Sequence, residues 1–333
     1  MIPTTIQRTY RVFGIITSAL LFSAYTGSAC QAQQAPWPPS VVKILVPLGP
    51  GGANDVVARL LAQHLQEKFK TAFVVENRVG AGGAVMMGAL AKSPADGSTF
   101  GIVSTATNAI LPALRSDLPY NPEKDFELVA LLAEYPLVLV TGPHVPANSL
   151  AEFVAYGKAN PDKLTFGSGG VGTAVHLVGE MVNATVGIKT RHIPFKGTSE
   201  YVSALLGGHI DYAVDGLINV AEAIRAGKLR ALAVTSPARF PELPTVPTMA
   251  ETYPGLIAVP WGGFAAPAGM PRSMVNAVSD EIRVFLDRPE TKAKLIKLWA
   301  VPSWKSSEDF QRFVAAERSR YAAIIKNSGT KIE

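Results

Sequence analysis

The sequence predicts an α/β protein of two domains, each built on a doubly wound, largely parallel sheet. At 333 residues the chain is too long for one ordinary hydrophobic core. Apolar runs of strand length alternate with amphipathic segments of helix length, and glycine-rich turns join them. Repeated β-α-β units of this kind place strands in parallel and cover both faces of a sheet.

The composition is that of a globular protein with no sign of a nucleic-acid or metal partner. Hydrophobic residues make up 48% of the chain and charged residues 17%, so disorder is not expected. The formal net charge of +5 is spread along the chain without a basic block. The five histidines show no metal-ligand spacing, and a single cysteine excludes structural disulfides. We expect no metal and no cofactor.

Residues 1–32 have the pattern of a signal peptide. A basic start at 8–11 precedes an apolar run at 12–25, which is too short to span a bilayer comfortably. Cys30 falls where a lipid-modified cysteine would stand, but Gly27 replaces the large aliphatic residue usual three positions earlier. We therefore expect an exported protein with a cleaved leader, and lipid anchoring at Cys30 is the less favoured alternative.

The clearest candidate site is the glycine-rich turn that follows a strand expected at 41–46. Gly51 and Gly52 allow the backbone to approach a ligand closely, and Asn54 and Asp55 are N-cap candidates for the next helix. A helix N-terminus beyond the carboxyl end of a strand offers free N–H groups and a positive dipole end. The turn therefore predicts an anion site sized for a carboxylate or phosphate. A tight turn in which glycine serves packing alone remains the alternative.

Polar turns follow several later strands as well. Residues 104–108 follow one strand, and a second glycine-rich turn at 167–173 opens a helix over 174–186. Lys196 and Asp215 follow two more strands. Ligands of open α/β sheets bind at the carboxyl ends of strands, so two such domains facing each other would line a cleft that closes on its ligand.

These turns offer neutral hydrogen-bond donors and no activated nucleophile. Ser168 lacks the full nucleophile-elbow pattern, and His176 is the histidine expected closest to the cleft. A hydrogen-bonded helix residue is the alternative for His176, and capping of a loop is favoured for Asp215. Binding fits better than catalysis, so we expect no enzyme. The competing hypothesis is an exported hydrolase that uses Ser168 or His176.

The chain resembles the Bug-type receptors, which are the extracytoplasmic solute-binding proteins of tripartite tricarboxylate transporters. The resemblance covers nearly the whole chain after residue 37. Its motifs include LVP at 45–47, PGGAND at 50–55, VENR at 75–78, GAGG at 80–83, FGSGG at 166–170, PFKG at 194–197 and LPTVPT at 243–248.

This resemblance implies a type II periplasmic-binding-protein fold with two doubly wound α/β domains and a hinge crossed twice. We expect residues 37–136 and 263–333 to form domain 1 and residues 137–262 to form domain 2, with the ligand cleft between them. The implied function is a monomeric periplasmic receptor that delivers a small carboxylic acid to the membrane permease subunits of such a transporter. A carboxylate-sensing receptor for a signalling partner is an alternative that the sequence does not separate from transport.

The family pattern implies ligand contacts from both domains. In domain 1 the matching positions are Leu48, Gly51, Gly52, Ala53, Asn54, Asp55, Thr105 and Asn108. In domain 2 they are Ser168, Gly172, Thr173, Ala174, His176, Lys196, Gly197 and Asp215. Leu48 stands where an aromatic residue is common and removes one wall of the distal pocket, so the identity of the acid stays open. Ala53 stands where a glycine is frequent, and it should be tolerated unless that position needs a positive φ.

Overall fold

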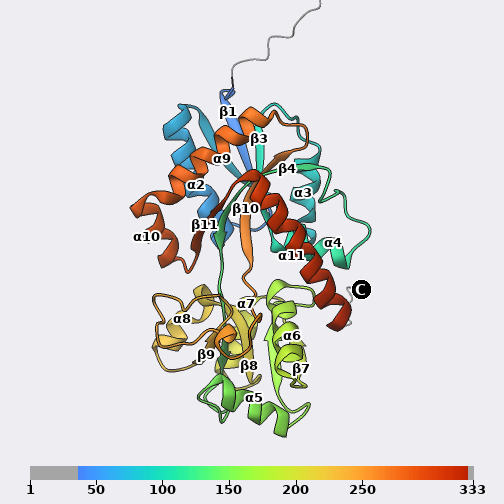
Figure 1. The fold of residues 1–333 in the computed structure, drawn as a ribbon, viewed down its shortest axis with the longest axis vertical. Helices are drawn as coiled ribbons and strands as arrows, with labels where there is room; N and C mark the ends of the chain where they lie inside the picture. Colours follow the sequence, from blue (N-terminus) through green and yellow to red (C-terminus); the bar gives the residue numbers. More distant parts are fainter. Residues whose placement is uncertain (1–36, 329–333) are drawn as a thin grey trace, which may run out of the picture. The chain divides into compact units, whose positions relative to one another are not determined.

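Two mixed β-sheets organise residues 37–328, the part of the chain that the computed structural model describes. Sheet A has six strands in the order β11-β4-β10-β3-β1-β2, and sheet B has five in the order β7-β6-β8-β5-β9 (Figure 1). The expected signal peptide at 1–32 and Cys30 lie outside the described residues.

Most strands fall on apolar runs, but β7 and β11 do not. The strands of sheet A are β1 (Val41–Val46), β2 (Ala72–Asn77), β3 (Thr99–Ser104), β4 (Phe126–Glu134), β10 (Trp261–Pro267) and β11 (Val301–Lys305). The strands of sheet B are β5 (Leu137–Thr141), β6 (Thr165–Ser168), β7 (Arg191–Pro194), β8 (Tyr212–Gly216) and β9 (Arg230–Val234).

The helices connect these strands. Those between or after strands of sheet A are α2 (Ala53–Phe69), α3 (Ala84–Ala91), α4 (Leu111–Leu114), α9 (Arg272–Asp287), α10 (Pro289–Lys297) and α11 (Ser307–Ser328). Those between strands of sheet B are α5 (Leu150–Ala159), α6 (Ala174–Val186), α7 (Thr198–Leu206) and α8 (Leu217–Arg225). Short irregular helices are η1 (Ala81–Gly83), η2 (Ala106–Ile110) and η3 (Met249–Glu251). No helix within 37–328 is long and apolar enough to cross a membrane.

The expectation of largely parallel sheets is wrong for part of each sheet. Strands β1, β2 and β3 are parallel, as are β6, β7 and β8. Strand β10 is antiparallel to both β3 and β4, and β5 is antiparallel to both β8 and β9. Strands β10 and β5 are the first that the chain forms after passing from one sheet to the other, so each enters its sheet from the opposite end. The edge strand β11 is also antiparallel to its neighbour β4.

The two passages between the sheets lie side by side. The first joins β4 to β5 through residues 135–136, and the second leads into β10 through residues 257–260; we call these the crossover segments. The backbone N–H of Tyr135 donates to the carbonyl oxygen of Pro260 at 2.7 Å. The short first passage therefore runs directly beside the return of the chain.

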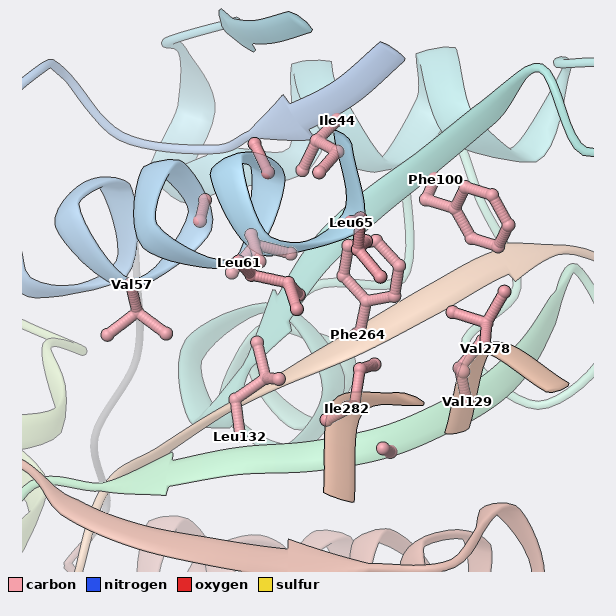
Figure 2. Close-up of a cluster of buried hydrophobic side chains, with 14 of the residues drawn as sticks. Ile44, Val57, Leu61, Leu65, Phe100, Val129, Leu132, Phe264, Val278 and Ile282 are labelled. Atoms are coloured by element: carbon pink, nitrogen blue, oxygen red, sulfur yellow. The ribbon is translucent and has the colours of Figure 1, made fainter. Parts of the chain in front are cut away.

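Apolar cores hold the helices against the sheets. In sheet A the rings of Phe100 (β3) and Phe264 (β10) stack with centroids 5.1 Å apart. Figure 2 shows Leu61 and Leu65 of α2 and Ile282 of α9 among the side chains gathered around them. Burying each such side chain contributes about 1.5–3 kcal/mol. Sheet B has its own core, which includes Phe153, Phe166, Val178, Val182 and Tyr212. These cores fix the positions of the turns at the strand ends.

Candidate functional site

The turn between β1 and α2 exposes its backbone. Gly51 has φ of +85°, which favours glycine, and a Cβ added there would meet no atom within 4 Å. The N-cap of α2 is Gly52, which supplies no side-chain hydrogen bond. The prediction of Asn54 or Asp55 as N-cap is therefore wrong. The first helical bond is made by the N–H of Val56, so the three preceding N–H groups have no partner within the helix.

The buried carboxylate of Asp55 holds this turn in place through hydrogen bonds. One carboxylate oxygen accepts hydrogen bonds from the Gly51 N–H and Arg59 Nε, both at 2.9 Å. The other accepts from Asn77 Nδ2 at 2.8 Å and from Arg59 at 3.0 Å. Burial alone would raise the pKa of Asp55, but the bonds from Arg59, Gly51 and Asn77 outweigh it and lower the pKa. The carboxylate is thus charged, 2% exposed and saturated with protein donors.

Asn77 also holds the start of the turn, because its Nδ2 group donates to the carbonyl oxygen of Leu48 at 2.8 Å. The Leu48 side chain is 49% exposed. It presents an apolar surface beside the open backbone of the turn. Ala53 is the first residue of α2 and does not have a positive φ, so an alanine fits at this position, where the family often has glycine.

Thr105 and Asn108 lie at the end of β3, the strand next to β1. Thr105 is the N-cap of a five-residue π-helical turn, η2, and Asn108 lies inside it; such turns are frequent at functional sites. The Thr105 hydroxyl accepts a hydrogen bond from the Trp261 N–H at 2.8 Å, which ties it to the start of β10. Asn108 is fully buried; its Oδ1 accepts from the Thr107 hydroxyl, and its Nδ2 has no hydrogen-bond partner.

The second glycine turn, between β6 and α6, is held by its own hydroxyl groups. Gly170 and Gly172 have φ of +120° and +80°. The Ser168 hydroxyl accepts from the Gly170 N–H at 3.2 Å, and the Thr173 hydroxyl donates to the Gly170 carbonyl at 2.8 Å. Thr173 is also the N-cap of α6, accepting from the His176 N–H. These contacts fix the exposed Val171 and the loop around it.

Two histidines, the buried His176 and the half-buried His192, support this turn. His176 Nδ1 accepts from the Gly172 N–H at 3.2 Å, and His192 Nε2 lies 2.7 Å from the Ser168 hydroxyl. The two rings are 4.0 Å apart. Burial lowers the pKa of His192 to about 4, and burial together with the neighbouring His192 lowers the pKa of His176 to about 4. Both are therefore neutral at pH 7, as the acceptor role of His176 Nδ1 requires.

Ser168 and His176, the two residues named for the hydrolase alternative, are not hydrogen-bonded to each other. Ser168 pairs with His192 instead, is fully buried and bonds to the backbone of its own loop. His176 is a hydrogen-bonded helix residue with 4% exposure. This agrees with the structural alternative for His176 and gives Ser168 a supporting place in the turn.

The remaining candidates follow β7 and β8. Lys196 is exposed and its N–H donates to Glu200, while Gly197 is the N-cap of α7 without a side-chain cap. Asp215 is buried, and one of its oxygens accepts from the Gly216 N–H at 2.6 Å and from Asn219 at 3.1 Å. Burial raises the pKa of Asp215. The expected capping role of Asp215 is confirmed by these bonds.

Both sets of turns adjoin the crossover segments. Ser104 at the end of β3 pairs with Gly262 of β10, and Gly216 at the end of β8 pairs with Leu137 of β5. Helix α11 also links the two sets, because its Tyr321 belongs to one apolar cluster with Ile110 of η2 and Leu177 of α6, against which Ala174 packs. The structure thus gathers the candidates of each sheet at one edge and brings the two edges to the same part of the molecule. No hydrogen bond joins the two sets of candidates within residues 37–328.

Four residues with a place in this architecture were not among the predicted site residues. Arg59 and Asn77 bind Asp55, His192 binds Ser168, and the Tyr135 hydroxyl donates to Asn54. Only Asn77 carried a usable signal, because it lies in the VENR motif.

Comparison with known proteins agrees with this architecture. The family described as tripartite tricarboxylate transporter family receptor matches residues 57–330. Protein BugT of Bordetella pertussis is 34% identical over 315 residues, which cover 94% of this chain and 97% of BugT. A UPF0065 protein from the tcbD-tcbE intergenic region of Pseudomonas sp. is 34% identical over 91% of this chain and 90% of its own length.

Solved structures show the same fold. Rpa4515 of R. palustris, solved with adipate, has a TM-score of 0.78 and 32% identity, covering 89% of this chain and 99% of its own. MatC of Rhodopseudomonas palustris, solved with bound malate, has a TM-score of 0.73 and 30% identity, covering 87% of this chain and 100% of its own. The expected two-domain fold class and the family resemblance are confirmed. The chain belongs to the tripartite tricarboxylate transporter receptor family.

Proposed function

We propose that this protein is a periplasmic receptor that captures a small organic carboxylate and delivers it to the membrane permease of a tripartite tricarboxylate transporter. Family membership supports the receptor role. The adipate and malate held by two structural relatives support an acid as ligand. The described residues suit binding, since the Ser168 hydroxyl is fully buried and bonds to the backbone of its own turn, and His176 accepts from the Gly172 N–H of the same turn.

The observation that carries this proposal is the chemistry of the turn before α2. Three helix N–H groups lack helical partners, and the N-cap Gly52 adds no competing acceptor. Asp55 is the only acidic residue between 47 and 55, and its oxygens are already bound by protein donors. The turn therefore offers donors and the positive end of a helix dipole to an anion.

We infer that the predicted site residues divide into two roles. The open turn positions contact the acid: Leu48, Gly51, Gly52, Ala53, Asn54, Gly172, Thr173, Ala174, Lys196 and Gly197. The buried residues hold these turns in place: Asp55, Thr105, Ser168, His176 and Asp215. Asn108 is also buried, but its Nδ2 group has no hydrogen-bond partner and can donate to the acid.

The crossover segments serve in this proposal as the hinge between two domains. Residues 37–136 and 263–333 form one domain and residues 137–262 form the other. The receptor acts as a monomer in the periplasm, after removal of its leader, and its partners are the permease subunits. Sheet membership supports this division, since β4 and β5 are consecutive in the chain but belong to different sheets.

A thermal-shift screen of the purified protein against organic acids, followed by calorimetry, tests the function. An acid present at about a hundred times its dissociation constant should stabilise the folded protein by about 2.7 kcal/mol. A class of carboxylates that raises Tm supports the receptor role and names the ligand group. If no acid shifts Tm, and mass spectrometry of the denatured protein finds no co-purified acid, the proposal fails.

A further inference from the structure

The side chain of Asn54, in the first turn of α2, is bound by a residue of the crossover. The Tyr135 hydroxyl donates to Asn54 Oδ1 at 2.7 Å, across 81 positions of sequence. Burial raises the pKa of Tyr135, so its hydroxyl keeps its proton at neutral pH and remains a donor. Its backbone N–H simultaneously binds Pro260 in the second crossover segment.

This contact decides which end of the Asn54 amide is left for a ligand. A carboxamide has one acceptor oxygen and one donor nitrogen, and rotation by half a turn exchanges them. With Oδ1 engaged by Tyr135, the Nδ2 group has no hydrogen-bond partner among residues 37–328 and is not a buried atom. Asn54 therefore offers two N–H donors beside the unpaired N–H groups of the helix start. Without the hydroxyl, the amide could turn its oxygen toward an anion.

Gly262, which follows the second crossover segment at the start of β10, leaves space for this hydrogen bond. A Cβ added at Gly262 of β10 would overlap Asn54 Oδ1 and lie 3.0 Å from the Tyr135 hydroxyl oxygen. Asn54 thus fits against both passages of the chain between the sheets. Thr105 is tied to the same region through the Trp261 N–H.

We propose that Tyr135 is a positioning residue for the acid site: it holds the Asn54 amide with its nitrogen free for the carboxylate and links the α2 turn to the crossover. This inference rests on the proposed function. Tyr135 does not touch the ligand, but it determines whether Asn54 presents its amide nitrogen or its amide oxygen to the ligand.

Calorimetry with adipate and malate as probes tests the ligand part in Tyr135→Phe, Asn54→Ala and the double variant. We expect each single change to raise Kd about threefold to tenfold, the range for one neutral hydrogen bond. The double variant should bind no more weakly than Asn54→Ala, because the hydroxyl acts only through the amide. Tyr212→Phe is the matched control: its hydroxyl donates to Asn183 Oδ1 at 2.6 Å within sheet B, and its loss should leave Kd unchanged.

Asn54→Asp separates positioning from a merely structural role. Its carboxylate still accepts the Tyr135 hydroxyl, so Tm should stay close to that of the wild type. Its second oxygen repels an acid, so Kd should rise by more than in Asn54→Ala. Wild-type Kd in Asn54→Asp, or a Tyr135→Phe variant with lowered Tm and unchanged Kd, would overturn the inference.

A measurement without ligand distinguishes this inference from the proposed function. The fall in Tm of the double variant should be smaller than the sum of the falls in the two single variants, because both remove the same bond. If the wild type binds no acid, the proposed function and the ligand part fail together, while this non-additivity still supports the link between Tyr135 and Asn54. Additive falls in Tm would overturn the link itself.

Discussion

Replacing Gly52 with valine tests the role of the α2 turn without disturbing the fold. Gly52 has φ of −70° and ψ of 161°, an extended conformation that suits a β-branched residue. The nearest atom to an added Cβ is the Gly49 carbonyl oxygen at 3.8 Å, an ordinary contact. The valine side chain would therefore stand in solvent, over the N–H groups that we assign to the acid.

The expected loss of affinity follows from the donors that valine covers. A hydrogen bond to a charged group is worth about 1.5–3 kcal/mol, so blocking one N–H should weaken acid binding by at least about tenfold. Gly52→Ala, with a smaller side chain, should show a smaller loss. Tm of the ligand-free protein should change little in either variant.

Gly51→Ala is the crossed control for this experiment. Its φ of +85° makes an alanine strained by about 1–2 kcal/mol, although no atom crowds the added Cβ. We expect it to lower Tm more than Gly52→Val does. Calorimetry and thermal unfolding of the variants are the assays, and wild-type affinity in folded Gly52→Val would refute the assigned role of the turn.

Three other changes probe the supporting groups. As pH falls from about 6.5 to about 4, the free energy of unfolding should decrease, because histidines in the unfolded chain bind protons before His176 and His192 do, whose pKa is lowered to about 4. His176→Asn should flatten this slope in Tm against pH, and parallel slopes in the variant and the wild type would contradict it. Asp55→Asn should lower the free energy of unfolding by about 1–3 kcal/mol, because it weakens the bonds to Gly51 and Arg59; an unchanged midpoint in urea would argue against this. Gly262→Ala should raise Kd, because its Cβ would displace the Asn54 amide. Gly263→Ala should mainly lower Tm and leave Kd nearly unchanged, because its Cβ would overlap the Phe310 ring. Equal effects of the two variants on Kd would count against Asn54 as a ligand contact.

Much of the fold could be predicted because its signals are local. The apolar run of β1, the glycines after it and the apolar face of α6 mark a strand, a turn and a helix within a few residues. The reversal of β5 and β10 could not be predicted in this way, since it depends on which sheet the chain enters. Strand β11 contains Pro302, which argues against a strand, and its half-buried residues give little apolar pattern. Helix α8 buries Leu217, Val220 and Ala221 at helical spacing, so its apolar face is a local signal for a helix.

The sequence predicts the glycines of the candidate site but not the residues that hydrogen-bond to the site residues. Gly51 and Gly172 have positive φ, which is the property that their sequence pattern indicates. The partners of the site residues depend on distant parts of the chain: His192 reaches Ser168 across 24 positions, and Tyr135 reaches Asn54 across 81. Neither partner lies in a motif, so only the fold reveals them.

The order of strands in sheet A also has a consequence for how the chain folds as it is synthesised. Sheet B uses one continuous stretch, from β5 to β9, and can close as soon as residue 234 has emerged. Sheet A has β10 between β3 and β4, so its earlier strands lack a central partner until residue 267 is made. During that interval β3 and β4 present unpaired edges, which invite wrong pairing between chains. The part of the chain made first is thus the part completed last.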